Sequence, residues 1–263
     1  GDPGRTKFFV SLEDDLMKNW GPDWIQDTYQ DYDVEERIGA TKPLTKRKYK
    51  NLVGRAQNAS ESSSQASRRM TLEFAESMNI QRDIIYKERN RLIKQEGRLD
   101  VIVEQIVREV FMRVADNKDY IDPIAFYRYI LDNVSYQVDP QTTHRSFRSK
   151  KTKKNFLWEI AQRELEAKYE ILGTDEVIAQ FQRMAILKAI DENWVEQVDY
   201  LQQLRAALSG QYASQKNPLV EFFQEAYQSF ERMKEAAKEQ MVRNLLLSRV
   251  EINKKGEIVL HFP

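Results

Sequence analysis

Few side chains in this 263-residue chain are of a kind that could carry out chemistry, and they lie far apart in the sequence. The histidines are His144 and His261, and there is no cysteine, so a zinc site, thiol catalysis and disulfides are not expected. The sequence has no phosphate-binding loop ending in Lys-Ser or Lys-Thr, no acidic strand end suited to magnesium, and no nucleophile placed beside His144. We therefore predict no catalytic residue, no metal site and no cofactor bound by this chain itself.

Positive charge is concentrated locally in the basic run from Arg145 to Lys154, which contains one aromatic residue. Such a run is often a solvated loop or the start of a helix, and that interpretation stays open. The functional alternative is a contact with acidic lipid headgroups or, as a weaker alternative, with nucleic acid. Because the chain carries 41 basic and 41 acidic residues, it has no overall field for nucleic acid, and we predict no such partner. The candidate lipid-contacting residues are Arg148, Lys150, Lys151, Lys153 and Lys154.

The composition predicts a mainly α-helical protein. Only 9 glycines and 7 prolines occur, beside many Glu, Lys, Gln, Ala and Leu residues, which favour helices over strands. No apolar stretch approaches the roughly 20 residues that would cross a bilayer.

Residues 1–43 are predicted to be a small mixed segment. Gly1-Asp2-Pro3-Gly4 has turn chemistry, and Lys7–Val10 is a candidate strand. Ser11 would cap a helix over Leu12–Trp20, which Gly21-Pro22 would stop. A chain that opens on a turn with no element before it suggests a fragment of a longer protein.

A very long helix is predicted from Leu44 to about Gln95. Apolar residues recur there at spacings of three and four, and neither proline nor glycine lies between Gly54 and Gly97. Serine and asparagine are frequent over residues 57–67 and disfavour helix interiors, so a linker in that stretch is the alternative.

Residues 98–173 are predicted to form a smaller, all-helical unit. An amphipathic helix would run over Leu99–Ala115. Asp122-Pro123 supplies an N-cap and a first-turn proline for a helix to about Asn133. A third helix, Phe156–Leu172, would be closed by Gly173.

The strongest periodicity predicts two long helices that fold back on each other over residues 174–248. Thr174 and Asn217 are placed as N-caps, with Pro218 at the first helical position. Narrow apolar stripes and a short connection favour antiparallel packing, and a hairpin of about 45 Å would project its loop away from its base. Residues 249–263 alternate in polarity and predict a β-hairpin that must pack on another element. The apolar positions of the two helices are Val177, Phe181, Met184, Leu187, Ile190, Trp194, Val198, Leu201, Leu204 and Leu208, then Leu219, Phe223, Ala226, Phe230, Met233, Ala237, Met241 and Leu245.

Four stretches of this sequence resemble the SecA family of ATP-driven protein translocases. The first is the opening GDPG with the following FVSLEDDLM, and the second is EFAESMNIQRDIIYKERN at 73–90, where the family writes EYDDVxNxQRxxIYxxRN. The third, IDENWVE at 190–196, is similar to the family's IDxxWxEH helix, and the fourth, YASQKNP at 212–218, to its YAQKDP loop. All four occur in the family's order. The departures, among them Gln197 in place of the motif's histidine and the missing cysteine tail, resemble the accessory SecA motors of Gram-positive bacteria.

The resemblance implies a division of the chain into five parts. Residues 1–43 would complete the second nucleotide-binding lobe, and 44–97 would be the long helix of a helical scaffold. Residues 98–173 would be a helical wing, 174–248 a two-helix finger, and 249–263 a terminal β-hairpin. The parent protein would bind ATP and Mg²⁺ and hydrolyse ATP, whereas this chain alone would be inactive.

The resemblance also implies partners, namely a SecY-type channel, a preprotein, the protein's own upstream nucleotide-binding lobes and an anionic membrane surface. The protein would be cytoplasmic and peripheral at the inner face of the plasma membrane. An aromatic side chain at the finger tip would grip an extended chain without regard to its sequence. The alternative, from another class, is a free-standing helical-hairpin adaptor that binds a partner helix. The implied tip residues are Tyr212, Gln215 and Lys216, and those implied to couple to the lobes are Gly1, Asp2, Glu76, Asn79, Gln81 and Arg82.

Overall fold

The computed structural model describes residues 3–5, 9–25, 47–120, 122–209, 218–253 and 258–263, and these are mainly helical as predicted. They fall into two compact units, Gly1–Ala75 and Glu76–Pro263, each described by itself below. The boundary lies within one helix, α4 (Leu52–Lys94), which is continuous through the serine-rich stretch at 57–67. The linker alternative is therefore wrong.

The first unit contains α1 (Asp15–Trp20), α3 (Arg47–Lys50) and the start of α4. The helix α1 begins three residues later than predicted, because Ser11 and Asp14 bond the local backbone into a turn. Gly21 ends α1 as predicted, and a Cβ there would lie 2.4 Å from the Met17 carbonyl oxygen. Phe9 and Val10 are not in a strand, and the rest of that predicted strand lies outside the described residues. Met17, Ile25, Leu52 and Ala56 form the buried core of this unit.

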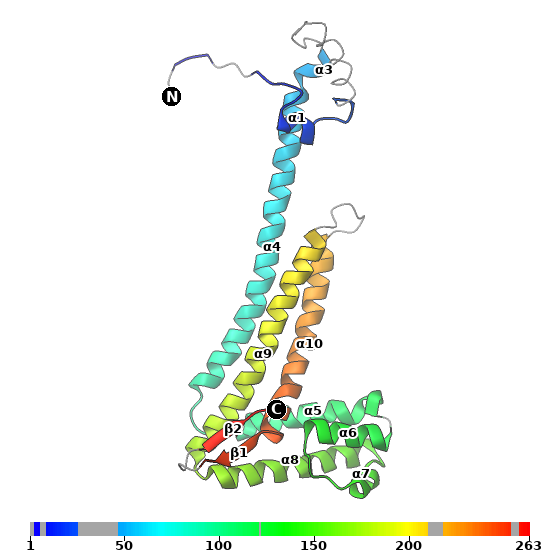
Figure 1. The fold of residues 1–263 in the computed structure, drawn as a ribbon, viewed down its shortest axis with the longest axis vertical. Helices are drawn as coiled ribbons and strands as arrows, with labels where there is room; N and C mark the ends of the chain where they lie inside the picture. The colour runs from blue at the N-terminus through cyan, green and yellow to red at the C-terminus, as the bar shows by residue number, and fades with distance from the viewer. Residues whose placement is uncertain (1–2, 6–8, 26–46, 121, 210–217, 254–257) are drawn as a thin grey trace. The chain divides into compact units, whose positions relative to one another are not determined.

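The second unit is built around two long antiparallel helices, α9 (Asp175–Ser209) and α10 (Pro218–Leu246), as predicted (Figure 1). The helix α9 begins after Thr174, whose hydroxyl accepts from the Val177 backbone N–H at 3.4 Å. At 1.5 Å per residue, α9 is about 50 Å long. Asn217 and the predicted tip lie outside the described residues.

Shorter helices gather at the base of this hairpin (Figure 1). Asp122 caps α6 through the backbone N–H groups of Ile124 and Ala125, as its Asp-Pro signal predicts. The helix α8 begins six residues before the predicted Phe156, because Ser149 and Thr152 form a capping box. Gly173 closes it with a φ of 76°. The base helices are α5 (Asp100–Asp116), the short 3₁₀ helix η1 (Lys118–Tyr120), α6 (Pro123–Asn133), α7 (Pro140–Ser146) and α8 (Lys150–Leu172).

The predicted β-hairpin is present as β1 (Arg249–Ile252) and β2 (Ile258–His261), paired antiparallel with Val250 opposite Leu260. It packs on the helical core as expected, since the Phe262 ring stacks on Phe181 of α9 with centroids 6.5 Å apart.

The apolar pattern of α9 is broader than a single stripe. Ile178, Ala185 and Ile186 are buried although the predicted stripe omits them, whereas Met184, which it includes, is exposed. The physical reason is that the N-terminal part of α9 packs against α8 and α10 and shares one core with residues of α4 and α5. A helix enclosed on several sides does not follow a narrow stripe.

Candidate functional site

An ion pair joins the C-terminal part of α4 to α9. The Arg89 guanidinium donates from Nε to one oxygen of Asp191 at 2.8 Å and from a terminal nitrogen to the other at 3.1 Å. This two-point geometry orients as well as attracts. The hydrogen bond from Arg89 to Asp191 raises the pKa of the guanidinium.

The end of α4 is held by a second arginine of α9. Arg183 donates to the carbonyl oxygens of Leu92 at 3.2 Å and Gln95 at 2.7 Å. The last carbonyls of a helix have no partner within it, so a cationic donor there satisfies them. Arg183 and Asp191 therefore attach α9 to two successive parts of α4.

A buried cluster of polar groups lies where α4, α9 and α10 meet. The amide nitrogen of Gln197 donates to Gln81 Oε1 at 3.0 Å and to Ser229 Oγ at 2.9 Å. Gln81 in turn donates to the carbonyl oxygen of Ala226 at 2.9 Å, and Ser229 Oγ donates to the same oxygen at 3.1 Å. Gln81 is 5% exposed, so these bonds replace the water that burial removes.

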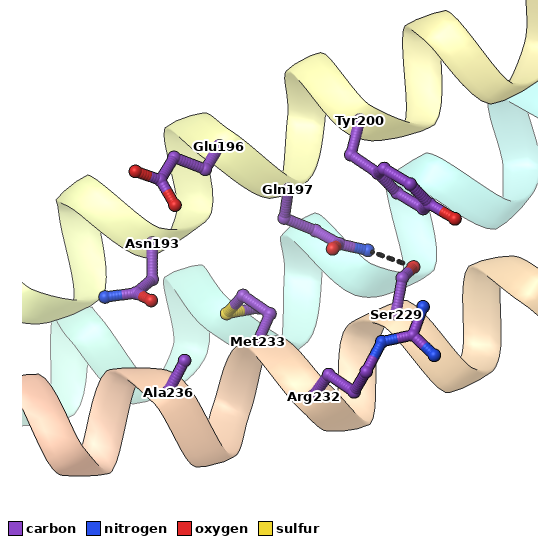
Figure 2. A pocket seen from close by; sticks show the side chains of 8 residues that line it. All are labelled: Asn193, Glu196, Gln197, Tyr200, Ser229, Arg232, Met233 and Ala236. Carbon is purple, nitrogen blue, oxygen red and sulfur yellow. Dashed lines mark hydrogen bonds between the residues drawn. The ribbon is translucent and has the colours of Figure 1, made fainter.

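A shallow groove of about 260 Å³ lies between α9 and α10 beside this cluster (Figure 2). At one end, Glu225 accepts from the Tyr200 hydroxyl at 2.9 Å and from Arg232 at 2.7 Å. The hydrogen bonds from Arg232 and Tyr200 lower the pKa of the Glu225 carboxyl. The groove is lined by Asn193, Glu196, Gln197, Tyr200, Ser229, Arg232, Met233 and Ala236.

Of the residues predicted to couple to nucleotide-binding lobes, those that the structure describes all lie on α4. Glu76, Asn79 and Arg82 are exposed on α4, and Arg82 contacts its neighbour Asp83 at 3.4 Å. Gln81 differs from them, because it is buried against α9 and α10 and its amide is hydrogen-bonded inside the helix junction. The predicted lobe residues Gly1 and Asp2 and the tip residues Tyr212, Gln215 and Lys216 lie outside the described residues.

The basic run covers the end of α7, the three residues that follow it and the start of α8. Arg148, Lys150, Lys151 and Lys154 are exposed, and Lys150 pairs with Asp116 at 2.6 Å. Lys153 differs from the other predicted lipid-contacting residues, because it is only 8% exposed.

Lys153 is buried among aromatic rings and backbone. Its ammonium donates to the Tyr120 carbonyl oxygen at 3.1 Å and lies 3.8 Å from the centre of the Phe147 ring. Burial is the main cause that lowers the pKa of Lys153, and the nearby charge of Lys150 acts in the same direction. Its role is to hold η1 and the start of α8 together.

Sequence reasoning missed the pairing of Arg89 with Asp191 and of Gln81 with Gln197. Both pairs join the stretch at 73–90 to residues 190–197, across more than 100 residues of sequence. These are the second and third of the stretches that resemble the family. The signal was available, since both stretches carry the family resemblance described above. Position along the sequence could not say that they meet.

The described residues offer no group of three or more His, Asp and Glu side chains that could hold a metal ion. Within the same residues, no helix is long and apolar enough to span a membrane. The interactions of this site are therefore structural: its ion pair and its amide cluster fix helices to one another.

Comparisons with known proteins agree with this architecture. Residues 43–249 match the family model of the SecA wing and scaffold domain, and residues 1–37 match that of the SecA P-loop domain. Among curated relatives, the chain is 49% identical to protein translocase subunit SecA 2 of Streptococcus gordonii and 50% identical to that of Streptococcus sanguinis. It is 34% identical to the SecA 2 subunit of Staphylococcus epidermidis. In each case all of this chain is covered, and it spans 33% of the relative's length.

Proposed function

The chain belongs to the SecA family, and from that premise we propose that it is the C-terminal part of an ATP-driven motor that moves preproteins through a SecY-type channel. Its similarity over its full length to subunits named SecA 2 supports the accessory type of motor. The family match leaves the alternative of a free-standing helical adaptor without support.

Within that motor, this portion would convey movement from the nucleotide-binding lobes to the hairpin α9–α10. The observation that carries this proposal is the Arg89–Asp191 ion pair, together with the Arg183 cap on the end of α4. A helix is stiff along its axis, and a displacement of α4 reaches α9 only if the two are joined at fixed points. The exposed Glu76, Asn79 and Arg82 would face the lobes, and Gly1 and Asp2 would complete the second one.

The division into lobe remnant (1–43), scaffold helix (44–97), wing (98–173), finger (174–248) and terminal β-hairpin (249–263) is part of this proposal. ATP and Mg²⁺ would be bound by the parent protein outside this chain, since its sequence has no phosphate-binding loop. Tyr212, Gln215 and Lys216 would contact the channel and the preprotein from the tip of the finger.

The proposal can be tested by exchange of this third of the protein in a relative. A chimera that carries this chain in place of the matching third of the Streptococcus gordonii subunit should restore export in a strain that lacks its own SecA 2. The same chimera with Tyr212→Ala should export less. A chimera that is folded and hydrolyses ATP but exports nothing would contradict the proposed function.

We also propose that the exposed basic residues Arg148, Lys151 and Lys154 contact an anionic membrane surface. Each basic residue near such a surface contributes about 1 kcal/mol of attraction, or roughly fivefold in partitioning. Replacing all three by glutamine should therefore lower binding to phosphatidylglycerol vesicles by roughly 100-fold, and the binding should weaken as salt is added. Co-sedimentation of the chain with vesicles measures this.

A matched control removes the same charge elsewhere. The triple variant Lys87→Gln, Arg91→Gln, Lys94→Gln changes three exposed basic residues of α4 and should bind the vesicles almost as the unchanged chain does. Equal losses from the two triple variants would mean that net charge, and not this surface, governs binding.

A further inference from the structure

The polar cluster at the helix junction depends on two glutamines that join three helices. Gln197 of α9 uses both hydrogens of one amide nitrogen, one toward Gln81 of α4 and one toward Ser229 of α10. Gln81 donates its own hydrogen bond to the Ala226 carbonyl of α10. Each helix is therefore hydrogen-bonded to both of the others within one turn.

These amides stand where apolar residues would stabilise the junction equally well. One turn further along α4 and α9, the corresponding positions are the buried Ile85 and Leu201. Apolar contacts tolerate sliding of one helix along another, whereas hydrogen bonds between buried groups are lost when the donor and acceptor separate. In coiled coils a single buried polar residue sets the register of the helices at a cost in stability.

We propose that Gln81 and Gln197 specify the axial register of the C-terminal part of α4 (residues 76–94) on the hairpin α9–α10. The choice of glutamine at 197 follows from geometry, because one amide nitrogen must donate to acceptors on two different helices. A neutral histidine, the residue type at this position of the resembling motif, has a hydrogen on only one of its two ring nitrogens, and in the protonated form the two N–H groups point apart. It could not replace both bonds.

The first test measures the register directly and uses the absence of native cysteine. Lys87 of α4 and Gln224 of α10 are both exposed. Spin labels attached to Lys87→Cys and Gln224→Cys report the distance between the two helices by double electron–electron resonance. The double variant Gln81→Leu, Gln197→Leu should broaden this distance distribution or shift it by about 5 Å, one helical turn. A control pair on Gln202→Cys of α9 and Gln224→Cys should be unchanged. An unchanged distribution for the first pair would overturn the proposal, because the register would then be fixed by Arg89 and Arg183 alone.

The second test separates register from stability. In the double variant the Ser229 hydroxyl still donates to the Ala226 carbonyl, so no buried polar group of the cluster is left without a partner. Gln197→Leu leaves the Gln81 side-chain oxygen without its donor, and Gln81→Leu leaves one amide hydrogen of Gln197 without its acceptor, and an unpaired buried polar atom is the costly case. Each single change should therefore lower the melting temperature by about 2–8 °C, while the double variant should melt within about 2 °C of the unchanged chain. Additive losses would instead mean that the glutamines contribute only stability.

A consequence for transport rests on the proposed function. In the Streptococcus gordonii chimera, the double variant should stay folded and hydrolyse ATP but lose most of its export, because α4 would slip along the hairpin. Normal export by a chimera whose labels show a relaxed register would remove this consequence. Failure of the unchanged chimera to export would contradict the proposed function and leave the distance measurements standing.

Discussion

Replacing Arg89 by alanine in the full-length translocase should lower preprotein transport about tenfold or more while ATP hydrolysis continues. The two hydrogen bonds to Asp191 join α4 to α9 at one fixed point, and on the proposed function their loss would remove a path for movement along α4. Coupling free energies between distant sites are typically about 1–3 kcal/mol, which corresponds to changes of about 5- to 150-fold. Transport per ATP hydrolysed, measured with purified motor and channel vesicles, is the relevant quantity.

Folding should survive this change. The Arg89 side chain is one-third exposed and that of Asp191 is about half exposed, so the pair contributes only about 1 kcal/mol to stability. The Arg89→Lys variant keeps the charge but loses the two-point geometry, and it should be impaired nearly as much. Exchange of the two residues, Arg89→Asp with Asp191→Arg, should restore part of the transport. If all three variants transported as much preprotein per ATP as the unchanged protein does, the pair would have no part in coupling.

The Arg82→Ala variant tests a different step. Arg82 is exposed on α4 and its ion pair is with its neighbour Asp83, so its loss should not alter the α4–α9 junction. If Arg82 contacts a nucleotide-binding lobe, as the resemblance implies, its replacement should uncouple ATP turnover from transport without changing the helix register. Unchanged transport would remove Arg82 from that interface.

Local signals predicted the ends of the elements well. The Asp122-Pro123 cap, the glycine after Leu172 and the Thr174 cap each act through hydrogen bonds within four residues. Such bonds need no knowledge of the rest of the fold. The predicted start of α8 is too late. Its capping box, Ser149 with Thr152, lies inside a basic run whose interpretation rests on its charge and not on a capping signal.

Contacts between distant segments could not be predicted in the same way. Gln81 is a polar residue among charged neighbours, and only its meeting with Gln197 and Ala226 turns it inward. Lys153 is likewise one of several similar lysines, and it alone reaches the Tyr120 carbonyl and the Phe147 ring. Periodicity distinguishes apolar from polar positions, but it does not select which polar side chain finds a buried partner.

Two residues of α9 test how well periodicity predicts which side chains are buried. Phe181 and Met184 both belong to the stripe predicted from periodicity, yet Phe181 is 1% exposed and Met184 is 49% exposed. The Phe181 ring also stacks on Phe262, the residue that follows β2. Phe181→Ala should therefore lower the free energy of unfolding by about 3–5 kcal/mol and loosen the β-hairpin. Met184→Ala should change it by less than about 0.5 kcal/mol.

Chemical denaturation of the two variants, with hydrogen exchange of the β1 and β2 amides, measures both effects. The loss in Phe181→Ala combines the missing transfer of an aromatic side chain with the cavity left beneath the β-hairpin. A third variant, Phe262→Ala, should raise exchange in β1 and β2 while leaving the helices of the base protected. Similar stability losses for Phe181→Ala and Met184→Ala would mean that α9 buries a simple stripe after all. The placement of the β-hairpin on α9 would then need revision.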